Sequence, residues 1–242
     1  MAVVALGAWG ALWLLGGSPY GHMLLHGASR LQTAAAFPIS FALVFVAGWT
    51  LMTLAMMLPT SLPLILMFHR MVSERPARPW LLTLLIAAYL AVWAACGVLL
   101  LFLNSIVAIG IASLPSLAAG PVINSAIILT IAGLYQFSSL KFACLDKCRS
   151  PMAFLITRWR GGNESFQALR IGAEHGLYCV GCCWSLMLLM FLVSAGSLAW
   201  MLLLGVVMAA EKNLSWGRRL SAPLGLMFLL GAAALLITKM TA

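Results

Sequence analysis

Long apolar segments separated by short charged loops dominate this chain. A segment of about 20 apolar residues is typical of a helix that crosses a bilayer, because its length matches the thickness of the hydrocarbon layer. In lipid, the backbone must satisfy its own hydrogen bonds, which favours helices. Seven segments approach this pattern, at residues 3–17, 37–68, 80–104, 122–137, 169–194, 198–210 and 222–239. We therefore expect an all-α fold, a polytopic transmembrane helical bundle of about six to seven spans, with residues 1–242 forming a single domain.

The second segment is too long for one simple span. It contains Pro59 and Pro63, and proline interrupts a helix because it lacks an N–H donor and clashes with the preceding turn. We predict a break here, followed by a tail that lies along the surface. Residues 152–159 predict a short amphipathic helix at the membrane interface, with Arg158 and Arg160 toward the phospholipid headgroups.

The distribution of charged residues indicates how the chain is oriented in the membrane. Hydrophobic residues make up 64% of the sequence and charged residues 8%, and the mean hydropathy of +1.07 is that of a membrane protein. The net charge of +9 comes from cations between the apolar segments, and 12 of the 14 Lys and Arg residues fall on one predicted side. This bias indicates the cytoplasmic side and argues against a nucleic-acid partner. We expect an integral protein of the bacterial inner membrane, with membrane lipid as a partner.

Residues 173–190 carry metal ligands within an apolar segment. His175, Cys179 and Cys182 are spaced to share one face of a helix, and Cys183 continues on its flank. Thiolate and imidazole groups together favour soft or borderline ions, first Cu(I) and then zinc. The alternative is that small Gly and Cys residues let helices pack closely.

A second pair of thiols, Cys144 and Cys148, follows the fourth apolar segment on the predicted cytoplasmic side. On a helix, residues four apart could chelate one ion; the alternative is two small residues at the start of a loop. If the fourth and fifth helices pack together, these thiols could meet Cys179, Cys182 and Cys183. Whether the two groups form one site or two stays open.

Secondary candidates are thioethers and two further imidazoles. Thioether is a good ligand for Cu(I) and a poor one for zinc, although Met also fills irregular gaps in apolar helices. Glu211 is expected to face Lys212 and the headgroups. His22 and His26 lie in the first outward loop and could bind a metal if that loop is helical; the alternative is an exposed interfacial pair. The thioether candidates are Met56, Met57, Met187 and Met190.

Four motifs together resemble one family. They are Ala55-Met-Met-Leu-Pro59, Ala132-Gly-Leu-Tyr-Gln136, Leu140-Lys-Phe-Ala-Cys144-Leu-Asp-Lys-Cys148-Arg-Ser-Pro151 and His175-Gly-Leu-Tyr-Cys179-Val-Gly-Cys-Cys183-Trp. The chain is similar to DUF2182, a family of predicted metal-binding integral membrane proteins. At least one member is described as a membrane copper chaperone that serves a copper oxidase of the tyrosinase type. The resemblance implies copper delivery to a client, with the motif residues Cys144, Cys148, His175, Cys179, Cys182 and Cys183 as metal ligands.

Signatures of common enzymes are absent. The sequence has no P-loop, no Gly-x-Ser-x-Gly, no His-Glu-x-x-His and no paired carboxylates, so we expect no enzyme and no catalytic residues. The leading hypothesis is a membrane protein that binds Cu(I) and delivers it to a client copper protein. Three alternatives stay open, namely a metal-ion permease, a membrane thiol–disulfide oxidoreductase and a structural subunit of a larger complex.

Overall fold

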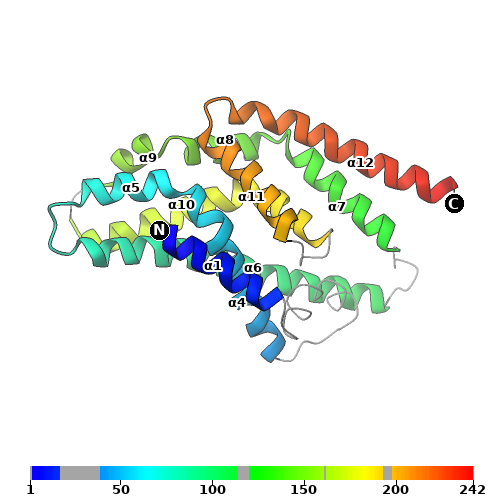
Figure 1. Ribbon diagram of the computed structural model, residues 1–242, viewed down its shortest axis with the longest axis horizontal. Coiled ribbons are helices and arrows are strands. Elements are labelled where there is room, and N and C mark those ends of the chain that lie inside the picture. The colour runs from blue at the N-terminus through cyan, green and yellow to red at the C-terminus, as the bar shows by residue number, and fades with distance from the viewer. Residues whose placement is uncertain (1, 17–38, 114–119, 161, 193–197, 242) are drawn as a thin grey trace.

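The computed structural model describes residues 2–16, 39–113, 120–160, 162–192 and 198–241, and these residues form helices and no strand. The all-α expectation is therefore confirmed over this part of the chain (Figure 1). The helices are α1 (Ala2–Gly16), α4 (Ile39–Thr60), α5 (Leu62–Met71), α6 (Arg78–Ser113), α7 (Pro121–Tyr135), α8 (Ser139–Arg149), α9 (Pro151–Arg158), α10 (Glu164–Leu188), α11 (Leu198–Asn213) and α12 (Ser221–Thr241), with short 3₁₀ turns η2 (Leu189–Phe191) and η3 (Gly217–Leu220).

The predicted break in the second apolar segment is confirmed. Helix α4 ends at Thr60, just after Pro59, and α5 begins at Leu62 with a proline in its first turn, where no N–H donor is needed. The segment after the break forms the separate helix α5, which buries one side against α6 and α9 and exposes Leu66 and Met71 on the other. Its position along the membrane surface stays a prediction. Phe68 is fully buried and meets the ring of Trp159 edge to face, with ring centroids 5.6 Å apart.

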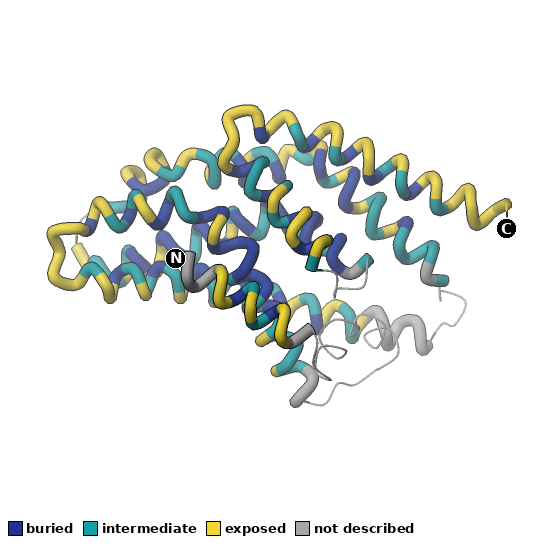
Figure 2. The backbone as a smooth tube through the Cα atoms, in the orientation of Figure 1, coloured by how far each residue is buried: buried dark blue, intermediate teal, exposed yellow. Residues whose placement is uncertain are grey.

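Helix α10 lies at the centre of the packing, along α6 and against α8 (Figure 1). Glycines make this close approach possible, since a Cβ atom on Gly172 would overlap the backbone of Leu85 in α6. The predicted amphipathic segment at 152–159 forms α9, which buries Phe154 and Leu155. Figure 2 shows buried residues gathered in the middle of the bundle, whereas α12, which ends at the C-terminus, exposes most of its length.

Helix α8 is held at both of its ends by one acidic residue of α11. The ammonium of Lys141 donates to the Glu211 carboxylate at 2.7 Å, and Arg149 donates to the Glu211 backbone carbonyl at 2.5 Å. Ser221 also donates to this carboxylate, at 2.8 Å. The side chains of Lys141 and Glu211 are almost fully shielded from solvent. The prediction that Glu211 faces Lys212 and the headgroups is therefore wrong.

Three helical segments in the described residues are long and apolar enough to cross a membrane, at Ala42–Thr60, Arg78–Ile106 and Gly217–Thr241. A fourth results if α7 and α8, which are bent by 64° at their junction, count as one span. The six to seven spans expected from the sequence are not confirmed. Helices α1 and α11 have 15 and 16 residues, which at 1.5 Å per residue fall short of a hydrocarbon layer of about 30 Å.

Candidate metal centre

The contact between α8 and α10 brings two of the predicted ligands together. The sulfur atoms of Cys148 and Cys182 lie 3.9 Å apart, although the two residues are 34 positions apart in the sequence. A metal ion binds thiolate sulfur at about 2.3 Å, so two sulfur ligands of one ion can be up to about 4.6 Å apart. The observed separation falls within this limit. The arrangement can therefore hold one soft ion between α8 and α10.

Gly181 sets the distance between these two helices. A Cβ atom added at Gly181 would lie 2.5 Å from the sulfur of Cys144, so only glycine leaves room for that thiol. The hydroxyl of Tyr135, at the end of α7, donates to the Gly181 carbonyl at 2.5 Å. Cys144 thus packs on α10 beside Gly181, one helical turn from Cys148 on α8.

Cys183 points to a different neighbour from Cys182. Its sulfur lies 3.6 Å from the thioether sulfur of Met57 on α4. Both thiols also donate to the backbone carbonyl of Cys179, Cys182 at 3.2 Å and Cys183 at 2.8 Å. Successive residues on a helix point about 100° apart, so α10 presents one thiol to α8 and the next to α4.

Lys212 brings a positive charge into this group of sulfur atoms. Its ammonium lies 2.9 Å from the sulfur of Cys179, 3.2 Å from the hydroxyl of Thr60 and 3.8 Å from the sulfur of Met57. Lys212 is only 6% exposed. A buried charge is costly unless it is paired, so this lysine and the sulfur atoms belong to one electrostatic unit. Sequence reasoning missed it, although a lysine in the last turn of an apolar helix was a signal.

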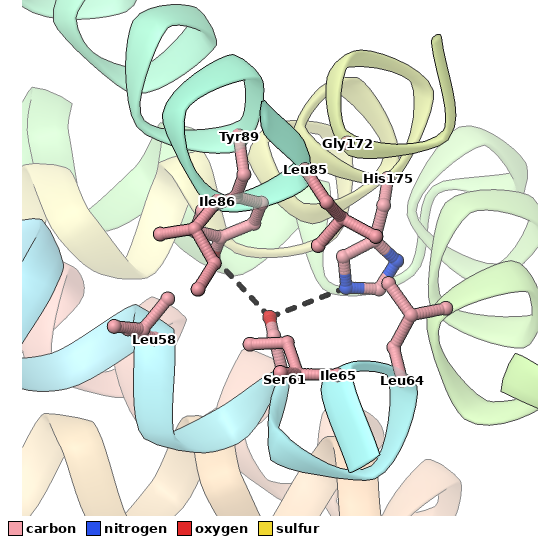
Figure 3. Close-up of a pocket in the computed structure, with 9 residues that line it drawn as sticks. All are labelled: Leu58, Ser61, Leu64, Ile65, Leu85, Ile86, Tyr89, Gly172 and His175. Carbon is pink, nitrogen blue, oxygen red and sulfur yellow. Dashed lines mark hydrogen bonds between the residues drawn. The ribbon is translucent and has the colours of Figure 1, made fainter. Parts of the chain in front are cut away.

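His175 faces a hydroxyl group. Its Nε2 lies 3.2 Å from the Ser61 hydroxyl, which lies 3.4 Å from the Tyr89 hydroxyl (Figure 3). Tyr89 in turn lies 3.1 Å from the sulfur of Cys179. A chain of polar groups thus joins the imidazole to the thiols. The Nδ1 atom of His175 is buried and has no hydrogen-bond partner among the residues that the structure describes. Sequence reasoning missed Ser61, which precedes α5, and Tyr89 of α6.

The predicted ligands do not gather into one large set. Within the described ranges, no group of three or more His, Cys, Asp or Glu side chains is placed to hold a metal ion. The structure instead offers pairs of sulfur atoms, Cys148 with Cys182 and Cys183 with Met57. Glu174 pairs with Arg158 and Arg170 and not with the neighbouring His175.

The remaining secondary candidates are three methionines and two histidines. Met56 packs against Gly205 of α11, with its methyl carbon 3.5 Å from the position of an added Cβ. Met187 and Met190 are both 1% exposed, in the core of the bundle. His22 and His26 lie outside the described residues. Their binding of metal stays a prediction.

A family model described as PpoB2, copper chaperone, matches residues 46–235. The chain belongs to this PpoB2 copper chaperone family. The matched range contains all the cysteines of the chain, together with Met57 and Lys212. No curated protein and no solved structure matches the chain.

Membership in the PpoB2 family supports a copper-related role, and it agrees with the copper-chaperone resemblance of the sequence motifs. It also supports copper as the metal and a client protein as a partner. The oxidation state of the copper, the possibility of zinc and the ligands themselves stay predictions.

Proposed function

We propose that this protein holds Cu(I) between Cys148 and Cys182 inside a bacterial inner membrane and passes the ion to a client copper protein. The observation that carries the proposal is the 3.9 Å separation of the two sulfur atoms across the α8–α10 contact. The apolar surface and the three or four membrane-length segments support embedding in lipid. Six to seven spans require α1, α10 and α11 to cross as well.

The ligand set favours Cu(I) over zinc. Structural zinc sites use four nitrogen or sulfur ligands, whereas soft Cu(I) accepts low coordination numbers and binds both thiolate and thioether. In the part of the chain that the structure describes, the candidate ligands lie in sulfur pairs and no group of three or more His, Cys, Asp or Glu side chains is placed to hold an ion. Met57 adds a thioether beside the thiols.

Ligand exchange is the mechanism that fits this arrangement. Cys148 is half-buried, whereas Cys182 is only 1% exposed. A thiolate of the client protein approaches from the side of Cys148 and bonds to the ion. The bond between copper and the sulfur of Cys148 then breaks, and the freed thiolate takes up a proton. A second ligand of the client displaces Cys182 in the same way, and the Cys182 thiolate also takes up a proton. Copper stays in the Cu(I) state, and no electrons are transferred.

Anaerobic titration with Cu(I) against a chromogenic chelator tests the proposal on the detergent-solubilised full chain. We expect the wild type to retain Cu(I), and we expect the Cys148→Ser and Cys182→Ser variants to give up to the chelator one equivalent that the wild type keeps. Cys96→Ser is the matched control, because Cys96 is a half-buried thiol of α6 on which this proposal does not depend. A wild type that binds no Cu(I), or serine variants that bind it as tightly as the wild type, would refute the proposal.

Delivery has its own test. Copper-loaded protein in sealed vesicles is mixed with an external apo-protein that holds Cu(I) through thiolates, and copper in the vesicle lumen is measured as well. We expect transfer to the external acceptor without accumulation in the lumen. Accumulation in the lumen without transfer would contradict delivery and favour the permease alternative.

A further inference from the structure

A second pair of sulfur atoms lies deeper than the first. The Cys183 sulfur on α10 and the Met57 sulfur on α4 are 3.6 Å apart. Cys183 is 1% exposed and Met57 is fully buried. The same geometric limit of about 4.6 Å for two sulfur ligands of one ion applies here. The pair combines a thiol with a thioether, which is a ligand set for Cu(I) and not for zinc.

We propose that Cys183 and Met57 form a second Cu(I) site, distinct from the Cys148–Cys182 pair. This inference rests on the proposed function, because it assigns a second position to the same cargo. The two sites lie on different faces of α10, the first against α8 and the second against α4.

The two pairs are neighbours on α10, and the proposed transfer moves one ion from the first pair to the second. Cys182 and Cys183 are adjacent in sequence, and both donate to the carbonyl oxygen of Cys179. In the transfer, Cys183 releases its proton as it bonds to copper, and Met57 adds its thioether without a proton change. The two thiolates left behind at Cys148 and Cys182 take up that proton and one more from solvent beside Cys148. Copper stays Cu(I) throughout.

Lys212 makes the second site selective for a monovalent ion. Its ammonium lies 3.8 Å from the sulfur of Met57 and 2.9 Å from the sulfur of Cys179. Cu(I) bound to one thiolate and one thioether is neutral and can lie beside this cation. A divalent ion with the same ligands keeps one positive charge, and two like charges in a buried place repel strongly. Zinc is therefore excluded from this site.

The number of Cu(I) ions bound per chain tests whether there are two sites. The full chain in detergent is titrated anaerobically with Cu(I) in the presence of a weak and then a strong chelator. We expect two equivalents in the wild type, and one equivalent in both Met57→Leu and Cys148→Ser. Met57→Leu conserves volume and removes only the sulfur. Met52→Leu, a buried methionine of the same helix, is the control and should keep two equivalents.

The outcomes distinguish this inference from the proposed function. If the wild type binds no Cu(I), both fail. If Cys148→Ser loses copper while Met57→Leu keeps the wild-type stoichiometry and affinities, only the second site is refuted. If Met57→Leu does not fold, Cys183→Ala tests the same site, and one equivalent bound with an unchanged affinity supports the proposal whereas two equivalents overturn it.

Discussion

The ammonium nitrogen of Lys212 lies 2.9 Å from the sulfur atom of Cys179, and both side chains are buried. A close charge contact of this kind is much stronger inside a protein than in water, because the surrounding dielectric constant is low. Copper held by two thiolates carries a net negative charge, so a fixed cation beside the thiols stabilises the loaded state. We therefore expect Lys212 to stabilise the copper-loaded state of the proposed site by its charge, without binding the metal itself.

Replacing this lysine should therefore weaken copper binding. We expect Lys212→Gln to lower the affinity for Cu(I) about 10- to 100-fold, as loss of a charged hydrogen bond costs about 1.5–3 kcal/mol. Competition with a Cu(I) chelator measures the change. Lys147→Gln removes the same charge from an exposed position of α8 and should leave the affinity within about twofold of wild type. An affinity for Lys212→Gln equal to that of the control would contradict the role of the lysine.

Adding a methyl group at Gly181 should separate α8 from α10. The new Cβ would lie 2.5 Å from the sulfur of Cys144, and overpacking of this kind costs about 1–3 kcal/mol. We expect Gly181→Ala to melt at a lower temperature and to bind Cu(I) less tightly, because the Cys148–Cys182 separation increases. In Gly231→Ala the nearest atom is 3.8 Å from the added Cβ, so neither property should change. Equal copper affinities in the two variants would refute this account of Gly181.

His175 provides a test of the coordination shell. Because its Nε2 faces Ser61, we expect X-ray absorption of the Cu(I)-loaded wild type to show sulfur neighbours and no imidazole nitrogen. His175→Gln should keep the copper stoichiometry and lose about 1 kcal/mol of stability with the hydrogen bond. The control is Ser61→Ala, which breaks the same hydrogen bond and should give the same spectrum. A nitrogen neighbour that is present in the wild type and lost in His175→Gln would make the histidine a ligand after all.

The helices followed from the sequence because hydrophobic length and proline position determine them. The break at Pro59 and the short helix after Pro151 were predictable for this reason. The contacts of polar residues that are neighbours in the sequence were not predictable in this way. Glu211 and Lys212 are adjacent, yet one pairs with Lys141 of α8 and the other with Cys179 of α10. Helical geometry alone separates them by about 100°, and it cannot say which residue faces which neighbour.

The candidate site, too, was predictable from the sequence only in part. Spacing along α10 identified Cys179, Cys182 and Cys183 as a group, and the structure places Cys148 beside Cys182. The partner of Cys183 depends on the crossing of α4 and α10, because Met57 is 126 positions away in the sequence. The links from His175 through Ser61 and Tyr89 depend on three separate segments. Such contacts arise from tertiary packing, which no local pattern encodes.

The attachment of both ends of α8 to Glu211 means that the thiols of α8 are positioned when the chain folds and not when the cargo arrives. The conformational entropy of bringing Cys148 to Cys182 is then lost during folding and not during metal binding, so the proposed site is preorganised. Glu211 is thereby expected to affect the affinity for copper although its side chain is not a ligand of the proposed site.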